Sequence, residues 1–278
     1  MIQFHWLKLN TYIWFTNVVY QIYTLFQIKQ TIFVKMSIIM TKLSKNITEK
    51  FKKISTATIA TCLFKRGLRN QFIQDVFPLS NAVGNMVGQA FTLRYIPARE
   101  DLNPVSVFKD PNHPQRVAIE TCPEGFVLVI DSRKNARAAS AGSILVTRLM
   151  KRGAAGIITD GGFRDSEEIA ALPFPSYHQK ASAPTNLTLH QALDINVPIG
   201  CGDVAVFPGD IVVGDQDGVI IIPLNIAEEV ALECEAMTMF EDFALEQVNN
   251  GSSIVGLYPP TDKQTLIDFE SWKKEFNK

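Results

Sequence analysis

The chain has 278 residues, of which 46% are hydrophobic and 20% charged, so it is long enough for one large domain or two small ones with a sizeable core. Its net charge of −1 provides no positive field for nucleic acid, which argues against non-specific nucleic-acid binding. The four cysteines and the four histidines are scattered without a C-x-x-C or H-x-x-x-H pair, a pattern that disfavours a zinc site or a disulfide framework and favours reduced thiols in the cytoplasm.

Residues 1–40 differ in composition from the rest of the chain. They contain no Gly, Pro, Ala, Asp or Glu. Residues 10–28 form an uncharged stretch of about the length of a membrane span. Asn and Gln interrupt that stretch, and no small-residue cleavage site follows it. We favour a translation start at Met36 or Met40, with a weak signal-anchor or a loosely packed extra helix as alternatives. We therefore expect residues 1–40 to lie outside the fold and residues 41–278 to form one domain.

The first part of this domain predicts helices and strands in alternation. An exposed amphipathic helix is expected over 41–53, and a second helix from the N-cap residues Ser55-Thr56-Ala57-Thr58 to about Lys65, before Gly67. Alternating and apolar runs predict further elements: a strand over 86–97, a short helix over 115–121 and a buried strand over 126–131. The loop at 99–114 contains three prolines and is long enough to have a function or to cover a neighbouring segment.

The stretch 138–172 contains two turns that can bind a ligand together. A helix is predicted from about Gly142 to Arg152, and a buried strand over 155–159. The first turn of the helix leaves N–H groups without partners, and Gly142 lets a small anion approach them. An ordinary capped helix start is the alternative interpretation.

The second turn, which follows the buried strand, contains Gly161-Gly162-Phe163-Arg164-Asp165. Open α/β sheets place ligands at the carboxyl ends of strands. Arg164 can bind a carboxylate through two parallel hydrogen bonds, and Asp165 is a suitable oxygen ligand for Mg²⁺ or Mn²⁺. The alternative is a solvated Arg–Asp pair in which Asp165 or Ser166 caps the next helix.

Beyond residue 172 the sequence predicts mainly short strands. We expect an edge strand over 173–177, a meander over 197–222, a long C-terminal helix over 226–248 and a tail from 251 to 278. Turn chemistry explains the four aspartates of this region better than a metal cage does: Asp203, Asp210, Asp215 and Asp217. The pattern indicates structural or surface positions for His178 and His190 rather than catalytic ones, and buried positions for the cysteines.

These motifs resemble those of the RraA-like family. The resemblance covers about residues 50–250, and its most specific part is Gly142-Ser143, twenty further residues, and then Arg164-Asp165. Further matching segments are Ser55-Thr56-Ala57-Thr58, Gly200-Cys201-Gly202-Asp203-Val204, Pro208 to Asp215, and Gly218 to Pro223. The family includes class II 4-hydroxy-4-methyl-2-oxoglutarate/4-carboxy-4-hydroxy-2-oxoadipate aldolases and a regulator of ribonuclease E activity.

The resemblance implies an α/β domain of the β/β/α swivelling type, assembled as a homotrimer or a multiple of one, with active sites at subunit interfaces. It implies that backbone N–H groups of Gly142, Ser143, Ile144 and Leu145 bind pyruvate. It also implies that Arg164 binds the substrate and that Asp165 binds Mg²⁺ or Mn²⁺.

Three features depart from the family pattern. Family members usually carry Asp or Glu where this chain has Ser143, and in the aldolases that acid orients metal-bound water. A catalytic Glu from a neighbouring subunit's C-terminal helix has its best counterpart in Glu241, with Glu235 and Asp242 as alternatives. The loop over 99–114 is longer than in short family members.

Two functional hypotheses follow from the resemblance. The first is a metal-dependent lyase that forms a pyruvate enolate from a 2-oxo acid by aldol cleavage or by decarboxylation, as of oxaloacetate. With Ser143 in place of the acid, decarboxylation is the easier reaction to explain, because it needs no base for a hydroxyl proton. The second is a non-catalytic trimer that binds and inhibits a ribonuclease.

Overall fold

The computed structural model describes residues 43–79 and 84–276. The interpretations of residues 1–40 therefore lie outside the described residues. Among the residues described, no helix combines the length and the apolar character needed to cross a membrane.

The α-helices lie mainly in the first half of the chain and at its end. They are α2 (Lys45–Phe51), α3 (Thr56–Lys65), α4 (Pro114–Thr121), α5 (Ser143–Lys151), α6 (Ser166–Ala170), α7 (Ala227–Asn249) and α8 (Lys263–Phe276). Short 3₁₀ turns add η1 (Val105–Lys109), η2 (Asn186–Thr188) and η3 (Leu224–Ile226). The Ser55 side chain accepts a hydrogen bond from Thr58 N–H and so begins α3 at the residue that the sequence indicated.

In the described part of the chain, nine strands form a mixed sheet in the order β1-β14-β13-β3-β4-β6-β8-β2, with β10 also paired to β3. Their bounds are β1 (Phe72–Ile73), β2 (Phe77–Pro78), β3 (Met86–Pro97), β4 (Phe126–Asp131), β6 (Gly156–Thr159), β8 (Ser176–His178), β10 (His190–Ile195), β13 (Ile211–Gly214) and β14 (Val219–Ile222). Strands β3, β4, β6 and β8 run parallel, and the remaining pairs are antiparallel.

Two smaller sheets accompany the main one. Strands β5 (Ala139–Ala141), β7 (Gly162–Phe163) and β9 (Lys180–Ala181) pair in parallel, while β11 (Ile199–Cys201) and β12 (Val204–Val206) form a hairpin.

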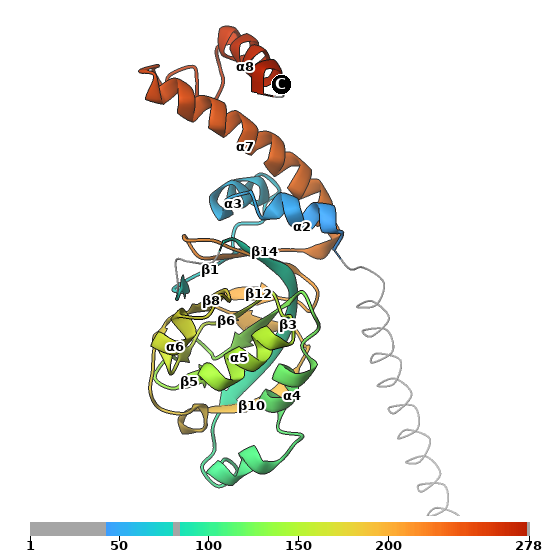
Figure 1. Cartoon of the computed structure of the whole chain (residues 1–278), viewed down its shortest axis with the longest axis vertical. Coiled ribbons are helices and arrows are strands. Elements are labelled where there is room, and N and C mark those ends of the chain that lie inside the picture. The colour runs from blue at the N-terminus through green and yellow to red at the C-terminus, as the bar shows by residue number, and fades with distance from the viewer. Residues whose placement is uncertain (1–42, 80–83, 277–278) are drawn as a thin grey trace, which may run out of the picture. The chain divides into compact units, whose positions relative to one another are not determined.

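The main sheet is covered differently along its length. Apolar side chains of β3, β4 and β6 pack against α4, α5 and α6 on one face, and those of the other face pack against β11 and β12. Strands β13 and β14 pack against α2, α3 and α7. Figure 1 shows this arrangement, with α2 and α3 beside α7 and with α4, α5 and α6 grouped along the parallel strands. Strands β4, β6, β13 and β14 therefore bury both faces, which explains their continuous apolar runs in the sequence.

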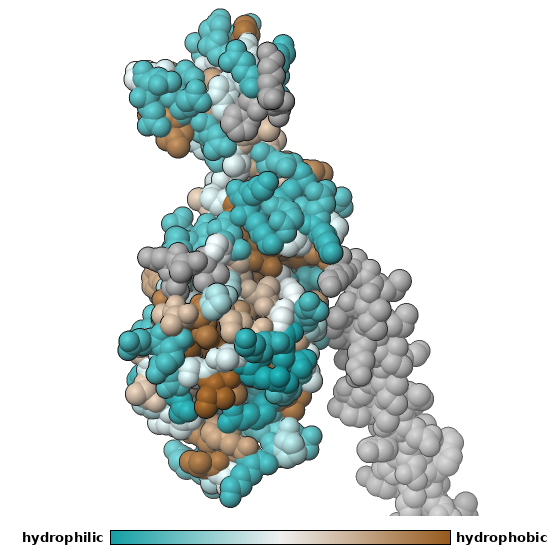
Figure 2. Space-filling model, viewed as in Figure 1, coloured by the Kyte–Doolittle hydropathy of each residue, from teal (hydrophilic) through white to brown (hydrophobic). Residues whose placement is uncertain are grey.

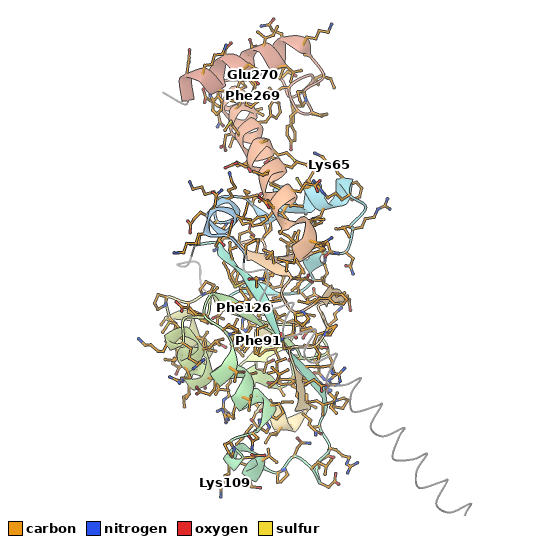
Figure 3. The ribbon with its side chains drawn as sticks, turned by 90° about the vertical axis from the view of Figure 1, so that its right-hand side faces the viewer. Lys65, Phe91, Lys109, Phe126, Phe269 and Glu270 are labelled. Carbon is orange, nitrogen blue, oxygen red and sulfur yellow. The ribbon has the colours of Figure 1, made fainter. Side chains whose placement is uncertain are left out.

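Helix α7 extends beyond the sheet and ends beside α8 (Figure 1). A separate apolar cluster joins these two helices: Phe240, Phe243, Ala244, Leu257, Phe269 and Trp272. Figure 3 shows Phe269 in this cluster, far from Phe91 in the core of the sheet. The surface of this end is mostly polar with scattered apolar patches (Figure 2), and Val255 is 87% exposed.

The structure confirms the predicted α/β class, and several predicted elements are close to the observed ones. Strands β3 and β4 have the expected bounds, and α7 is shifted by one residue. The helix predicted over 41–53 is shorter, and it is not simply exposed, because Ile47 and Phe51 are buried against the sheet and α7.

Three predictions beyond residue 172 were wrong. Strand β8 is not an edge strand, because β2 pairs with its outer side. The meander is two hairpins in different sheets, since the turn at Pro208-Gly209 separates β12 from β13 and Gly209 N–H donates to Ala90 C=O. The predicted tail contains α8, which Phe269 and Trp272 hold against α7.

A tight backbone contact in the sheet predicts a change in stability. An added Cβ at Gly88 of β3 would lie 2.6 Å from Gly125 O, whereas one at Gly200 of β11 would meet no atom within 4 Å. We expect Gly88→Ala to lower the free energy of unfolding by about 1–3 kcal/mol, because the backbone must shift. Gly200→Ala is the matched control and should stay within about 0.5 kcal/mol of wild type in urea titrations. Equal stabilities of the two variants would contradict the proposed packing.

Candidate functional site

The two turns predicted to form one site meet in the structure. Strands β5 and β7 pair in parallel, and Arg164 N–H donates to Ala141 C=O at 3.1 Å. Helix α5 begins directly after β5, and α6 begins directly after β7. The pairing therefore places the N-terminus of α5 beside Arg164 and Asp165.

The Asp165 carboxylate is directed to α5 and not to its own helix. Ser143 donates to Asp165 Oδ2 from its N–H at 3.1 Å and from its hydroxyl at 3.4 Å, and Arg164 Nε lies 3.7 Å from the same oxygen. Asp165 has φ 55° and makes no side-chain cap bond to α6. Aspartate is among the few residues that adopt this left-handed conformation readily. Asp165 occupies the N-cap position of α6, but its side chain does not cap that helix, and Ser166 Oγ donates to Phe163 C=O instead.

Gly142 makes this contact possible because it has no side chain. An added Cβ at Gly142 would lie 2.6 Å from Asp165 Oδ2 and 2.9 Å from Arg164 Nε. The backbone of Gly142 is extended, with φ −127°, so the need for glycine arises from the close approach and not from an unusual backbone angle. Gly142 thus allows the cation and the carboxylate to lie against the helix start.

The first turn of α5 keeps two N–H groups available. Ser143 N–H is bonded to Asp165, and Leu145 N–H donates to Gly142 C=O at 3.1 Å. For the N–H groups of Gly142 and Ile144, the described residues supply no hydrogen-bond partner. Of the four residues predicted to bind an anion, these two have the free donors. Ile144 is also 80% exposed, so its side chain does not shield the turn.

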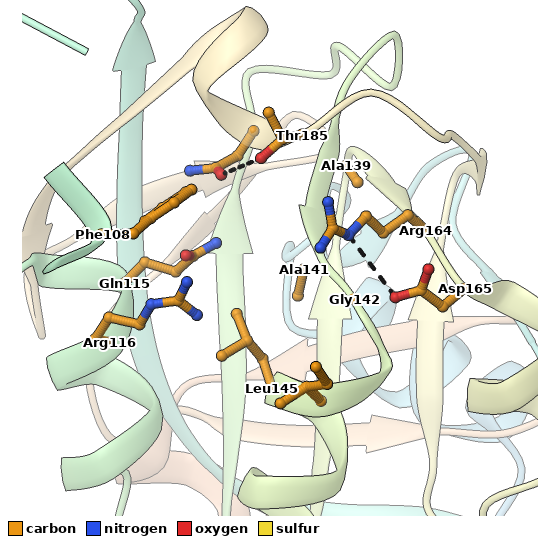
Figure 4. Close-up of a pocket in the computed structure, with 12 residues that line it drawn as sticks. Phe108, Gln115, Arg116, Ala139, Ala141, Gly142, Leu145, Arg164, Asp165 and Thr185 are labelled. Carbon is orange, nitrogen blue, oxygen red and sulfur yellow. Dashed lines mark hydrogen bonds and ion pairs between the residues drawn. The ribbon is translucent and has the colours of Figure 1, made fainter. Parts of the chain in front are cut away.

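A pocket of about 170 Å³ lies over this turn. One side is lined by Gly142, Ile144, Leu145, Arg164 and Asp165, whereas Ser143, which the sequence also assigned to the site, is not among the lining residues. Figure 4 shows Arg164 and Asp165 together on this side, with Leu145 below. The side chains of Arg164 and Asp165 are 46% and 39% exposed, so a ligand can reach both. This side offers a cation and N–H donors to an anion, and a carboxylate to a metal ion.

The opposite wall was not predicted from the sequence. It contains Phe108, Gln115 and Arg116, which Figure 4 shows across the pocket from Arg164, and the pocket is completed by Thr185 and Asn186. Phe108 lies in η1 of the long loop at 99–114, whose length was the one available signal. Gln115 and Arg116 lie in the first turn of a short helix, where nothing in their spacing distinguishes them from surface residues.

A buried carboxylate supports the turn between β6 and β7 from below. Asp160 accepts hydrogen bonds from the N–H groups of Ser132 at 2.6 Å, Lys134 at 3.0 Å and Gly202 at 3.2 Å. Burial raises the pKa of Asp160 to about 6, although the three backbone donors oppose that rise. Asp160 therefore ties the loops after β4 and β11 to the end of β6.

Three hydroxyl groups form a second buried contact under the pocket. The oxygens of Ser132, Ser140 and Thr159 lie 2.6–3.1 Å from one another, and Gly161 N–H donates to Thr159 Oγ1 at 3.0 Å. An added Cβ at Gly161 would lie 2.6 Å from Ser132 Cβ. Together these contacts fix the backbone that leads to Arg164.

The other acidic candidates take part in turns, as the sequence indicated. Asp210 accepts from Phe207 N–H, and Asp215 accepts from Thr56 and Asp217 N–H. Asp203 has φ 65° and pairs with Lys134. Within the described residues, no group of three or more His, Cys, Asp or Glu side chains could hold a metal ion.

His178, His190 and the four cysteines are buried and do not line the pocket. His178 stacks on Phe163, and burial lowers its pKa to about 4; its Nδ1 has no partner in the part of the chain that the structure describes. His190 contacts Arg133 and Asn135 C=O, and burial and the Arg133 charge lower its pKa to about 4. All four cysteines are buried.

Glu241 does not line the pocket of its own chain. It lies on α7, where Thr58 Oγ1 donates to it at 2.7 Å and Tyr258 OH donates at 3.1 Å. Of the two alternatives, Glu235 pairs with Lys50. The expectation that Glu241 serves a neighbouring subunit's site stays a prediction.

A single carboxylate in the pocket fits Mg²⁺ or Mn²⁺ better than a zinc-type cage. Magnesium keeps several waters and is often bound by one or two carboxylates together with substrate oxygens. Asp165 Oδ2 is bonded to Ser143, while no donor among the described residues reaches Oδ1. Asp165 therefore has one oxygen available to a cation in the pocket.

The curled sheet, its helical cover and the pocket between β5, α5 and β7 define an α/β protein with a small polar site. The chain belongs to the RraA-like family, described as Aldolase/RraA, whose model matches residues 56–221. That match includes both turns of the pocket and both residues of the Arg164-Asp165 pair.

Named relatives of the family include aldolases. A Halalkalibacterium halodurans protein, provisionally named 4-hydroxy-4-methyl-2-oxoglutarate aldolase, is 34% identical over 185 residues, which is 65% of this chain and 78% of that protein. A Thermus thermophilus protein named 4-hydroxy-4-methyl-2-oxoglutarate aldolase is 28% identical over 155 residues, which is 56% of this chain and 92% of that protein.

A solved structure shares the fold. The Streptomyces coelicolor protein RraAS2, described as an unusual member of the RNase ES inhibitor RraA protein family, superposes with a TM-score of 0.65. It is 25% identical, and the match covers 73% of this chain and 98% of that one.

The lowered pKa of His178 predicts sensitivity to acid. Because the folded state resists protonation of His178 between the unfolded pKa near 6.5 and the folded pKa near 4, the unfolded state binds more protons there. The free energy of unfolding should therefore fall by roughly 2 kcal/mol from this group between pH 7 and pH 5. His178→Phe keeps the stack on Phe163 and removes the titration, so urea titrations should show a smaller loss of stability than in wild type. An identical loss in both proteins would contradict this assignment.

Proposed function

We propose that this protein is a divalent-metal-dependent lyase that releases pyruvate from a 2-oxo acid by way of its enolate. The bond broken is either the C3–C4 bond of a 4-hydroxy-2-oxo acid, as in 4-hydroxy-4-methyl-2-oxoglutarate aldolases, or the bond to a β-carboxylate, as in oxaloacetate. The observation that carries the proposal is the pairing of β5 with β7, which sets Arg164 and Asp165 beside the free N–H groups of α5. The relatives named as aldolases support a lyase.

The residues in and beside the pocket have separate roles in binding. Arg164 and the N–H groups of Gly142 and Ile144 bind the substrate carboxylate, because all three present donors to the same side of the pocket. Ser143 holds the Asp165 carboxylate through two donors and so fixes its orientation. The substrate is thereby held with the bond to be broken in one position, while the Asp165 carboxylate keeps its orientation.

Asp165 would hold the cation, Mg²⁺ or Mn²⁺, which supplies positive charge where negative charge develops on the keto oxygen. Since Asp165 is the one carboxylate among the pocket residues, the substrate's own oxygens complete the set of ligands. The protein's contribution is to keep Asp165 in reach of both the cation and Ser143.

Ser143 affects which bond is broken. Aldol cleavage needs a base for the C4 hydroxyl proton, and a serine hydroxyl that donates to Asp165 is not an anionic base. Decarboxylation needs no such base. In a homotrimer or a multiple of one, Glu241 of a neighbouring copy would supply the missing carboxylate, and aldol cleavage would then need an assembled protein.

A regulator that binds and inhibits a ribonuclease is the second candidate function. Ser143 favours it, and so does the likeness to RraAS2 of the RNase ES inhibitor family. The pocket weighs against it, because binding a ribonuclease does not require a carboxylate beside an anion site. Metal-dependent turnover of a 2-oxo acid distinguishes the lyase from the regulator.

Removal of the Asp165 charge tests the lyase directly. Asp165→Asn keeps an acceptor for Ser143 and suits the left-handed backbone, but it loses the anionic ligand. We expect pyruvate release from oxaloacetate and from 4-hydroxy-4-methyl-2-oxoglutarate to fall by roughly 100-fold or more, as it should when EDTA is added to wild type. Asp217→Asn, in a turn outside the pocket, is the control. Absence of metal-dependent turnover in wild type would leave the regulator as the function.

The close contact at Gly142 gives an independent test. Gly142→Ala should leave the free energy of unfolding within about 1 kcal/mol of wild type, since the atoms it meets belong to side chains that can move. It should lower kcat/KM by roughly 10–100-fold, because Asp165 and Arg164 are displaced. Steady-state kinetics and urea unfolding of the same preparation measure both effects. Unchanged kinetics would contradict a role for this turn.

A further inference from the structure

A closed ring of three buried hydroxyl groups lies beneath the pocket. Ser132, Ser140 and Thr159 are each 0% exposed. The oxygens of Ser140 and Thr159 lie 2.6 Å apart, and Ser132 Oγ lies 2.7 Å and 3.1 Å from them. A hydroxyl group donates once and accepts up to twice, so each member of such a ring can donate to one neighbour and accept from the other. Three groups that burial would otherwise leave without partners therefore satisfy one another.

The ring joins the two halves of the candidate site. Ser140 is the middle residue of β5, which leads to Gly142 and the free N–H groups of α5. Thr159 ends β6, and its Oγ1 accepts from Gly161 N–H at 3.0 Å in the turn that leads to Asp165. The contact between Ser140 Oγ and Thr159 Oγ1 thus links the segment assigned to the anion to the segment assigned to the metal ion.

Two further contacts fix the carbonyl group of Ser140. Tyr95 OH of β3 donates to it at 2.9 Å, and Gln115 Nε2 of α4 donates to it at 2.7 Å. Both side chains are buried. A carbonyl oxygen has two lone pairs, so these two donors saturate it. Ser140 therefore connects β3, α4 and the end of β6 through one residue of β5.

The Ser140 side chain itself does not reach the pocket. Successive side chains of a strand point to opposite faces, and the neighbours of Ser140 on either side, Ala139 and Ala141, line the pocket (Figure 4). The space around the ring is filled, because an added Cβ at Gly161 would lie 2.8 Å from Ser140 Oγ. The ring therefore acts on the pocket only through the backbone that it holds.

We propose that Ser140 and Thr159 are positioning residues of the reaction, whose hydroxyl contact holds the free N–H groups of α5 at a fixed distance from Arg164 and Asp165. This inference rests on the proposed function, in which a substrate bridges the two halves of the site. Each half binds its own group without the ring. The bond to be broken is aligned only when both halves keep their separation, because small displacements of reacting groups lower the rate strongly. The ring therefore contributes to kcat more than to KM.

Paired variants of Thr159 separate positioning from folding. Thr159→Val removes the hydroxyl group and keeps the shape, whereas Thr159→Ser keeps the hydroxyl group and removes a methyl group. We expect the Mg²⁺-dependent kcat for oxaloacetate to fall roughly tenfold in Thr159→Val, with KM within about threefold of wild type. Thr159→Ser should keep kcat within about twofold of wild type, although the loss of a buried methyl group lowers its stability in urea titrations.

A double-variant cycle tests the ring as one unit. Ser140→Ala should also lower kcat roughly tenfold, and its combination with Thr159→Val should lower kcat by no more than about threefold beyond either single change, because both break the same contact. Ser176→Ala is the matched control, since it alters a buried serine that bonds to Phe174 C=O outside the pocket. It should keep kcat within about twofold of wild type.

A third measurement needs neither a metal ion nor a substrate. Arg164 N–H donates to Ala141 C=O and so bridges the two halves directly. Amide hydrogen exchange of the ligand-free full chain should show Arg164 N–H exchanging roughly tenfold faster in Thr159→Val and in Ser140→Ala than in wild type. In Thr159→Ser it should exchange at the wild-type rate.

The outcomes separate this inference from the proposed function. If wild type shows metal-dependent turnover, the positioning role is overturned by an unchanged kcat in Thr159→Val, by an equal loss in Thr159→Ser, or by losses that multiply in the double variant. Each of these results leaves the lyase intact. An Arg164 exchange rate that is the same in all these proteins overturns the claim that the ring holds the two halves together. Absence of metal-dependent turnover in wild type overturns both the lyase and the positioning role.

Discussion

The position of the pocket depends on one buried carboxylate, that of Asp160. Three backbone N–H groups from the loops after β4 and β11 converge on it, so it joins segments that are far apart in the sequence. The strand β6 that leads to Asp160 is apolar and lies in the centre of the sheet, which excludes water from these bonds. Because removal of a partner from a buried charged group is costly, the turn that carries Arg164 and Asp165 has few alternative conformations.

Much of the fold was predictable because local sequence signals, such as capping residues and apolar runs, agree with which residues are buried in the structure. The capping residue Ser55, the apolar run at 126–131 and the long apolar pattern at 226–248 each specify an element without help from distant residues. Two of the three predictions that were wrong concern pairing partners, and the third missed α8 in the C-terminal tail. Which strand covers β8, and whether β12 continues into β13, depend on segments whose sequence is too short to indicate pairing.

The candidate site divides in the same way. Gly142, Arg164 and Asp165 could be singled out because they lie in two turns that follow regular elements and match the spacing of the family motif, although a capped helix start and a solvated Arg–Asp pair also explained the residues taken alone. Ser140 and Thr159 could not, since the contact between their hydroxyl groups exists only once the fold has brought β5 and the end of β6 together. No sequence pattern reports what the hydroxyl group of a buried residue contacts.

A side chain at position 142 would need the space that the Asp165 carboxylate occupies, and this links the two positions within the family. Any side chain at position 142 takes the place of the carboxylate at position 165, so the two positions cannot vary independently while the site persists. One substitution at position 142 would therefore displace the Asp165 carboxylate and leave the sheet and its cores intact. Such a step would change the pocket of a common scaffold while the free energy of unfolding changes by no more than about 1 kcal/mol.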